Sequence, residues 1–236
     1  MIIISILAFL LSVQAETIPN DTIRKIDEFM STLYAQGDFN GSILVGVNER
    51  VIYSKGFGMA NFKTGENFTP STSSCIASLT KQFTSMGIMM LAEKQVLAYD
   101  DPVTKYIRKL PSCYQAVTIR HLLNHTSGVF DYDNLGHGSP DNLIMKKNSL
   151  RFPPGERYEY SNSNYVLLSI VVEKLSGTSF REFLQTNIFS PLDMTRTFAY
   201  QHPNQKVKGV AVAYNQFGKD NDYDSPAHFG DGGIYS

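Results

Sequence analysis

Two long apolar segments constrain the fold of this chain more than any other feature. Residues 79–94 and 161–175 carry hydrophobic side chains at helical spacing, and Gly177 follows the second segment. Apolar residues at this period indicate helices that bury at least one face, and a glycine just past the end is typical of a helix C-terminus. The sequence therefore predicts two buried helices. We expect the methionines of the first helix to pack in the core; they are Met86, Met89 and Met90.

The remaining segments predict a mixture of helices and strands. Residues 42–47 and 51–56 indicate a β-hairpin, which residues 57–62 extend before a turn at Lys63-Thr64-Gly65. Further helices are predicted over residues 19–36, 118–124 and 180–189, a loop over 130–140 and an extended segment over 206–213. This order is typical of an α+β fold in which a helical region is set into a sheet domain.

The composition excludes two broad classes of protein. The chain has 236 residues, of which 42% are hydrophobic and 18% charged, and its formal net charge is -1. That hydrophobic content is enough to build a core, so the chain is not a disordered segment. Proteins that bind nucleic acid use a basic excess to release counterions, and this chain has none. We therefore expect no nucleic acid among its partners.

The first residues indicate the compartment. An apolar run over residues 2–13 leads into Val13-Gln14-Ala15, which offers small residues where a signal peptidase requires them. This pattern predicts a signal peptide over residues 1–15 and a secreted or periplasmic protein. The run is shorter than the roughly 20 residues that span a bilayer, so we expect no stable membrane span after cleavage. No Lys or Arg precedes the run, which leaves an uncleaved anchor or a core segment as alternatives.

Two cysteines, Cys75 and Cys113, are too few for a disulfide framework. Outside the cell they could form one disulfide. We favour two buried free thiols that act as small apolar residues, because Cys75 lies three residues before Ser78, a candidate nucleophile.

The sharpest chemical pattern is Ser78-Leu79-Thr80-Lys81, at the start of the first apolar segment. This spacing places the hydroxyl and the amine on one helical face, and the positive end of the helix dipole favours an oxyanion near Ser78. A lysine in a dry site loses its charge more readily and can accept the proton of a serine nucleophile. The same residues also fit an N-cap serine followed by a surface lysine, so the motif alone does not decide.

A second polar corner, Tyr160-Ser161-Asn162, opens the other apolar segment after a turn at residues 152–155. A tyrosine hydroxyl beside a lysine can relay a proton, and an asparagine amide can hold a substrate carbonyl or orient Lys81. The plainer alternative is a packed tyrosine and a capping asparagine.

Taken together, these segments resemble a known family, the class C β-lactamase and penicillin-binding-protein-like serine hydrolases. The resemblance covers residues 41–236 and rests on several specific motifs in the family's order. The motifs are Cys75–Thr84, Leu122–Gly128, Pro154–Asn162 continued through Glu173–Gly177, and Ile188–Met194 with Thr197.

The resemblance implies a fold and a mechanism. The fold would be an antiparallel sheet flanked by helices, with an all-helical subdomain over roughly residues 95–200. By the same resemblance, Ser78 is the acylated nucleophile, Lys81 its proton partner, and Tyr160 the general base and acid. Asn162 would contact the substrate and Lys81. The implied substrates are β-lactams, D-amino-acid peptides or esters, and no cofactor is implied because Lys81 and Tyr160 supply the proton transfers.

One motif of the family is not in its expected place. Relatives carry Lys-Thr-Gly or His-x-Gly on a strand after the Tyr-x-Asn segment, and that strand supplies an oxyanion N–H beside the one from Ser78. Lys63-Thr64-Gly65 precedes Ser78, and His228-Phe229-Gly230 runs straight into a Gly-rich segment. We therefore expect residues 16–236 to be an incomplete domain without the later sheet strands. Losing one oxyanion donor costs about 10²–10³ in rate, so we expect residues 16–236 alone to be weakly active or inactive.

Two further patterns suggest metal ions only weakly. His121 and His125 lie four residues apart, as some zinc ligands do, but the glutamate of the protease motif is lacking. Asp220, Asp222 and Asp224 alternate like a calcium loop, but Ser225 stands where glycine is needed. We expect no metal site.

The sequence leaves two hypotheses about function. The first is a secreted serine hydrolase that forms an acyl-enzyme on Ser78. The alternative is a catalytically inactive or truncated relative whose pocket binds a peptide, a cell-wall fragment or a partner protein. The two hypotheses share the fold and differ in whether Ser78 acquires a covalent acyl group.

Overall fold

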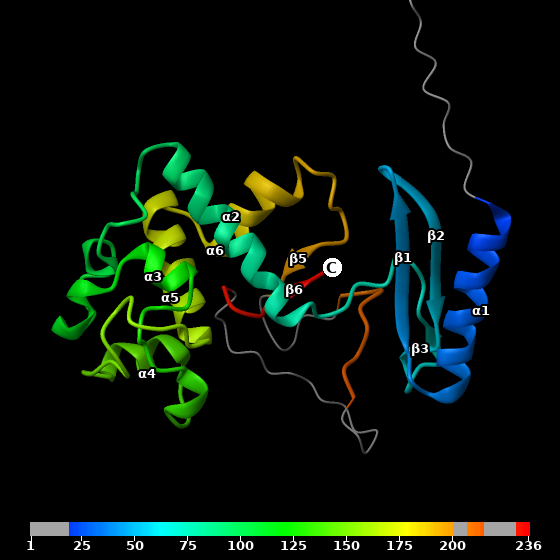
Figure 1. Ribbon diagram of the computed structural model, residues 1–236, viewed down its shortest axis with the longest axis horizontal. Helices are drawn as coiled ribbons and strands as arrows, with labels where there is room; N and C mark the ends of the chain where they lie inside the picture. Colours follow the sequence, from blue (N-terminus) through cyan, green and yellow to red (C-terminus); the bar gives the residue numbers. More distant parts are fainter. Residues whose placement is uncertain (1–18, 201–206, 215–229) are drawn as a thin grey trace, which may run out of the picture. The chain divides into compact units, whose positions relative to one another are not determined.

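The chain divides into two compact units, which meet in the sequence at Pro70 and Ser71. The computed structural model describes residues 19–200, 207–214 and 230–236 (Figure 1). The expected signal peptide, residues 1–15, lies outside the described residues. None of the helices in the described ranges is long and apolar enough to cross a membrane.

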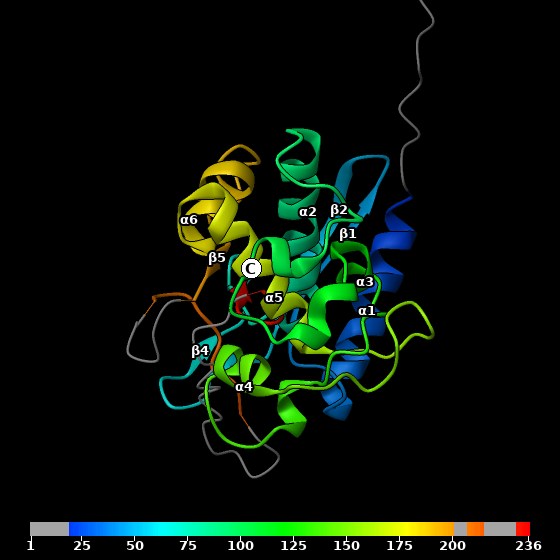
Figure 2. The same cartoon turned by 90° about the vertical axis from the view of Figure 1, so that its left-hand side faces the viewer.

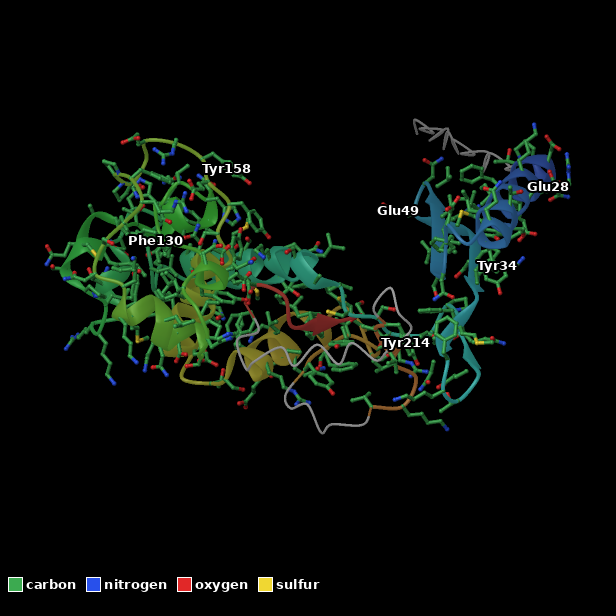
Figure 3. All side chains as sticks on the ribbon, turned by 90° about the horizontal axis from the view of Figure 1, so that it is seen from below. Glu28, Tyr34, Glu49, Phe130, Tyr158 and Tyr214 are labelled. Atoms are coloured by element: carbon green, nitrogen blue, oxygen red, sulfur yellow. The ribbon has the colours of Figure 1, made fainter. Side chains whose placement is uncertain are left out.

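The first unit is a helix packed on a β-hairpin. Helix α1 (Asn20–Gln36) precedes strands β1 (Gly41–Val47) and β2 (Arg50–Phe57), which pair antiparallel. The predicted helix and hairpin are confirmed. The turn consists of Asn48 and Glu49, both with positive φ (46° and 63°), which suits the twist of a two-residue hairpin; Figure 3 labels Glu49 at this tip. Apolar residues of α1 and both strands form the small core of the unit, centred on Met30, Tyr53 and Phe57.

The residues after β2 do not extend the hairpin as expected. Strands β3 (Met59–Asn61) and β4 (Glu66–Asn67) pair with each other in a second two-stranded sheet. Gly58, with φ of 75°, separates β2 from β3 and turns the chain out of the first strand. Lys63-Thr64-Gly65 lies in the turn between β3 and β4, as the sequence predicted.

Helix α5 is the centre of the second unit. It contacts α2, α3, α4 and α6, which surround it in Figure 2. The α-helices of this unit are α2 (Thr80–Glu93), α3 (Ile119–Leu123), α4 (Pro140–Lys146), α5 (Asn162–Ser176) and α6 (Phe180–Leu184). Short turns of 3-10 helix include η1 (Ala77–Leu79) and η4 (Tyr132–Asn134), and a π-helical turn, η5 (Gln185–Phe189), follows α6.

The two predicted buried helices are confirmed as α2 and α5, but the methionines of α2 are not all in the core. Met86 and Met89 are 45% and 50% exposed, whereas Ile88 and Leu91 on the same helix are buried. The buried residues of α2 include the polar Thr80, Lys81 and Thr84, so burial on this helix does not follow its apolar residues alone. Helix α5 ends as predicted at Gly177, which adopts a left-handed conformation.

A short segment at the end of the chain lies along the start of α2. Strands β5 (Phe198–Ala199) and β6 (Ile234–Tyr235) form a small antiparallel sheet. Residues 230–236, red in Figure 1, are hydrogen-bonded to Thr80 and Thr84 of α2. The extended segment expected over residues 206–213 is not a strand within its described part: Val210 forms an isolated bridge with Ser73, and residue 206 lies outside the described residues.

Candidate active site

Ser78 lies in η1, immediately before the first turn of α2. The preceding residue, Ala77, has a positive φ of 44°, a conformation that costs a non-glycine residue free energy and is concentrated at functional sites. Two hydrogen bonds to Ile234 hold this turn: Ile76 N–H donates to the carbonyl of Ile234 at 3.0 Å, and Ile234 N–H donates to Thr80 Oγ1 at 3.1 Å. The serine hydroxyl is therefore presented at the positive end of a well-anchored helix.

The ammonium of Lys81 lies among three acceptors. Its Nζ is 3.2 Å from Ser78 Oγ, 2.9 Å from Asn162 Oδ1 and 2.7 Å from the main-chain oxygen of Asp231. These match the three N–H donors of a lysine. Lys81 is only 8% exposed, so its position is fixed. The alternative of a surface lysine, which the motif left open, is wrong.

Tyr160 contacts the same serine from a different segment. Its hydroxyl donates to Ser78 Oγ at 2.8 Å, and Lys81 Nζ lies 5.0 Å from the centroid of its ring. Tyr160 belongs to the segment that leads into α5, two residues after Tyr158, which Figure 3 labels. The structure thus brings Ser78, Lys81 and Tyr160 together, although the tyrosine is far from the other two in the sequence.

Asn162 is the first residue of α5, and two aspartates hold it. Its main-chain N–H donates to Asp131 Oδ2 at 2.9 Å, and its Nδ2 donates to Asp133 Oδ2 at 3.1 Å. These bonds direct the remaining amide oxygen, Oδ1, toward Lys81. All four residues that the sequence predicted for the site lie together, and Asp131 and Asp133 are two members that sequence reasoning missed.

Two carboxyl groups near the site are shielded from water, that of Asp231 almost fully and that of Asp131 in part. Asp231 is buried and accepts a hydrogen bond from the Tyr132 hydroxyl at 2.7 Å. Burial raises the pKa of the Asp231 carboxyl, and it also raises the pKa of the Asp131 carboxyl. Thr84 Oγ1 donates to the main-chain oxygen of Gly230 at 2.6 Å, which secures the segment that carries Asp231. The main chain at Asp231 thereby keeps its carbonyl on Lys81.

His125 is a further residue that sequence reasoning did not place in the site. Its imidazole is 8% exposed and stacks on Tyr160, with ring centroids 4.4 Å apart and an interplanar angle of 25°. Burial, with the nearby charge of Lys81, lowers the pKa of His125 to about 4. The sequence pointed to His125 as a weak metal candidate with His121 and as a member of the motif Leu122–Gly128, without a role in the site. Instead, each imidazole accepts a hydrogen bond from a main-chain N–H. Thr118 N–H donates to His121, and Ser161 N–H donates to His125.

The cysteines are free thiols. Cys75 and Cys113 form no disulfide, and Cys113 is half-buried rather than fully buried as expected. Cys75 is exposed, so the expectation of a buried thiol is wrong for it. It lies opposite Tyr235 at a bridge to the last segment, and this arrangement leaves its side chain at the surface.

The motif His228-Phe229-Gly230 is described only at Gly230, because residues 228 and 229 lie outside the described residues. A side chain at Gly230 would place its Cβ 2.2 Å from the main-chain oxygen of Tyr165. The close approach of this segment to α5 therefore requires glycine. Asp220, Asp222 and Asp224 also lie outside the described residues.

Comparison with known proteins identifies the family. The family model described as Beta-lactamase matches residues 24–236. The chain belongs to the beta-lactamase family. This confirms the resemblance that the motifs at Ser78 and Tyr160 carry.

Relatives and solved structures of this family agree with the fold. Penicillin-binding protein 4* of Bacillus subtilis is 34% identical over 207 residues, which cover 83% of this chain and 45% of that protein. A penicillin-binding protein from Bacillus halodurans is 30% identical with a TM-score of 0.77, covering 87% of this chain and 68% of that one. The octameric penicillin-binding protein homologue from Pyrococcus abyssi is 33% identical with a TM-score of 0.75, and the match covers 91% of this chain and 53% of that one. The predicted α+β fold of the β-lactamase/transpeptidase type is confirmed, and the chain spans about half the length of the curated relatives it matches.

Proposed function

We propose that the chain is a serine hydrolase of the β-lactamase and DD-peptidase type, which acts through an acyl-enzyme on Ser78. One observation carries the proposal: Lys81 Nζ and Tyr160 Oη both lie within hydrogen-bond distance of Ser78 Oγ, at 3.2 and 2.8 Å. A nucleophile with proton-transfer groups in direct contact is the arrangement that nucleophilic catalysis requires. Membership of a family that includes serine hydrolases supports the same class of reaction.

In the proposed acylation, Ser78 Oγ attacks the carbonyl carbon of an amide, β-lactam or ester. In this step Tyr160 acts as a phenolate beside the Lys81 cation: it accepts the hydroxyl proton of Ser78, and as a phenol it then donates that proton to the departing nitrogen or oxygen as its bond to carbon breaks. The three acceptors around Lys81 fix its charge beside the tyrosine. A cation in this place stabilises the negative charge that develops as the proton leaves Ser78.

Deacylation reverses these roles. A water molecule attacks the ester of Ser78, its proton passes to Tyr160, and Ser78 Oγ recovers a proton as the acyl group leaves. We propose that Asn162 Nδ2, which keeps one N–H group beside the one it donates to Asp133, contacts the substrate. The proposed substrates are β-lactams, D-amino-acid peptides or esters, and the proposed location of the protein is secreted or periplasmic.

The proposal is tested by labelling the purified chain with a fluorophosphonate and following the rate of adduct formation. We expect Lys81→Met and Tyr160→Phe to lower the rate by about 10²–10⁴, the usual contribution of general acid–base groups. Lys174→Met, which removes an exposed lysine of α5, should label at the original rate. Equal labelling of all four proteins would contradict the proposal. A folded chain that takes no label would instead support a relative that only binds its ligand.

A further inference from the structure

The buried residue His125 is hydrogen-bonded to the residues just before and just after Tyr160. The Nδ1 atom of His125 accepts a hydrogen bond from Ser161 N–H at 3.1 Å, and the main-chain oxygen of His125 accepts one from Glu159 N–H at 2.8 Å. These two donors flank Tyr160 in the sequence. The main chain of Tyr160 is therefore tied to His125 at the residue before it and at the residue after it.

The side chain of Tyr160 depends on the same residue. Tyr160 is 42% exposed, so burial covers only part of its side chain. Its ring stacks on the His125 imidazole, with centroids 4.4 Å apart and an interplanar angle of 25°. The imidazole also contacts Tyr165 of α5, at 5.2 Å and 34°. Through this contact, His125 links the exposed ring of Tyr160 to a residue of the central helix.

We propose that His125 is a positioning residue that holds the Tyr160 hydroxyl on Ser78, and that it does so only while its imidazole is neutral. This inference rests on the proposed function, since it assigns a role within the same reaction. His125 is 8% exposed and no contact joins it to Ser78, so it acts through Tyr160 rather than on the substrate.

The requirement for a neutral ring follows from the hydrogen bond. Because Nδ1 accepts a main-chain N–H, the proton of the neutral imidazole lies on Nε2. Protonation places a second proton on Nδ1, which can then no longer accept from Ser161. The bond that ties the residue after Tyr160 would break, and Tyr160 would lose its alignment on Ser78.

The surroundings of His125 favour the neutral form. The titratable groups that face it are Lys81 on α2, Tyr158 and Tyr160 on the segment before α5, and Tyr165 on α5. The amide of Asn164 also lies 3.2 Å from Nδ1. No carboxylate is among these described contacts, while Lys81 repels a second positive charge. Burial and Lys81 together lower the pKa of His125 to about 4.

The test compares His125→Asn with His121→Asn. His125 has a positive φ of 57°, which asparagine tolerates better than most residues, and an asparagine Oδ1 can replace Nδ1 as acceptor. The variant therefore keeps the fold but loses the stacked ring. His121→Asn makes the same change at a residue that caps α3. We expect His125→Asn to slow acylation by fluorophosphonate by about tenfold to 100-fold, the size of effect that misplacing a catalytic group can produce. His121→Asn should react at the original rate.

A second readout separates this inference from the proposed function. The ring resonances of Tyr160 are followed by NMR from pH 7 to 3.5 in chain labelled with ¹³C-tyrosine, and Tyr160→Phe identifies the signal. We expect the signal to move with a midpoint near pH 4 in the unsubstituted chain and to stay constant in His125→Asn. This readout needs no acylation, so it decides the inference even if the chain takes no label. A Tyr160 signal that does not respond to pH, or a His125→Asn variant that acylates at full rate, would overturn the inference.

Discussion

At the scale of single residues, the site is controlled by the direction of one amide. Asn162 could present either its oxygen or its nitrogen to Lys81, and only the oxygen can accept a lysine N–H. Asp133 decides between them, because its carboxylate accepts from Nδ2 at 3.1 Å and leaves Oδ1 for Lys81 at 2.9 Å. An exposed loop carboxylate therefore fixes the orientation of a side chain that contacts the buried cation.

Asp133→Ala should weaken this orientation. With the acceptor removed, the Asn162 amide can rotate and Lys81 loses one of its three partners. A net hydrogen bond contributes about 1 kcal/mol, so we expect acylation of Ser78 to slow by about fivefold. The rate is measured by labelling with fluorophosphonate at several concentrations.

Asp133→Asn is the matched control, because an asparagine oxygen can still accept from Asn162 Nδ2. It should retain most of the acylation rate. Loss of rate in both variants would show that the negative charge of Asp133, rather than the orientation of Asn162, is what matters.

At the scale of elements, the loop after α3 supports the candidate active site. Main-chain hydrogen bonds join it to the segment before α5, from Arg151 N–H to Gly128 O, from Gly155 N–H to Thr126 O and from Glu159 N–H to His125 O. The same loop continues to Asp131, which accepts from the first N–H of α5. Residues 125–131 thereby position the segment that carries Tyr160 and the start of the central helix.

Gly128→Ala tests this pairing. Gly128 has φ of 72°, and a Cβ there would lie 2.1 Å from the main-chain oxygen of Phe152. Overpacking costs about 1–3 kcal/mol and a left-handed conformation about 1–2 kcal/mol more. We therefore expect a loss of unfolding free energy of about 3 kcal/mol, measured by urea denaturation.

Gly177→Ala is the matched control, because it measures the free-energy cost of the left-handed backbone conformation alone. Gly177 has nearly the same φ, 73°, but no atom lies within 4 Å of the position of its Cβ. This variant should lose only about 1–2 kcal/mol. Equal losses in the two variants would contradict the close approach of Gly128 to Phe152.

Elements with a clear local pattern could be predicted, and contacts between distant loops could not. The hairpin, α1, α2, α3 and α5 follow from periodicity and from end signals such as Gly177. Ser78, Lys81, Tyr160 and Asn162 stood out because they open predicted helices. Asp133 and Asp231 did not stand out, and His125 stood out only in the motif Leu122–Gly128 and as a weak metal candidate, because the role of each depends on loops that only folding brings together. The exposure of Met86 and Met89 was also missed, since composition does not reveal which side of α2 contacts α5.

At the scale of the whole molecule, the site concentrates buried and half-buried ionisable groups whose pKa values shift in opposite directions. His125 has its pKa lowered to about 4, while burial raises the pKa values of Asp131 and Asp231. Each shift makes folding stability depend on pH. For the histidine, the unfolded chain binds a proton below its ordinary pKa of 6.5, whereas the folded protein does not until about pH 4. Its contribution to stability is therefore complete above pH 6.5 and is lost as the pH falls toward 4.

His125→Asn should remove that dependence. Between pH 7 and 4.5 the unsubstituted chain should lose about 2 kcal/mol more unfolding free energy than the variant does, since one pKa unit corresponds to about 1.4 kcal/mol. The raised pKa values of the two aspartates act in the opposite sense, and they are present in both proteins. The difference between the two curves, measured by urea denaturation at each pH, therefore isolates His125. Parallel curves would show that the histidine titrates normally in the folded chain.

The central claim is that Ser78 is an activated nucleophile, and intact-mass spectrometry tests it most directly. The purified chain and Ser78→Ala are weighed before and after incubation with a reactive penicillin and with a fluorophosphonate. We predict a single covalent mass gain in the unsubstituted chain and none in the variant, and the reagent that reacts indicates the class of substrate. A folded chain that gains no mass from either reagent, or an equal gain in Ser78→Ala, would contradict the claim.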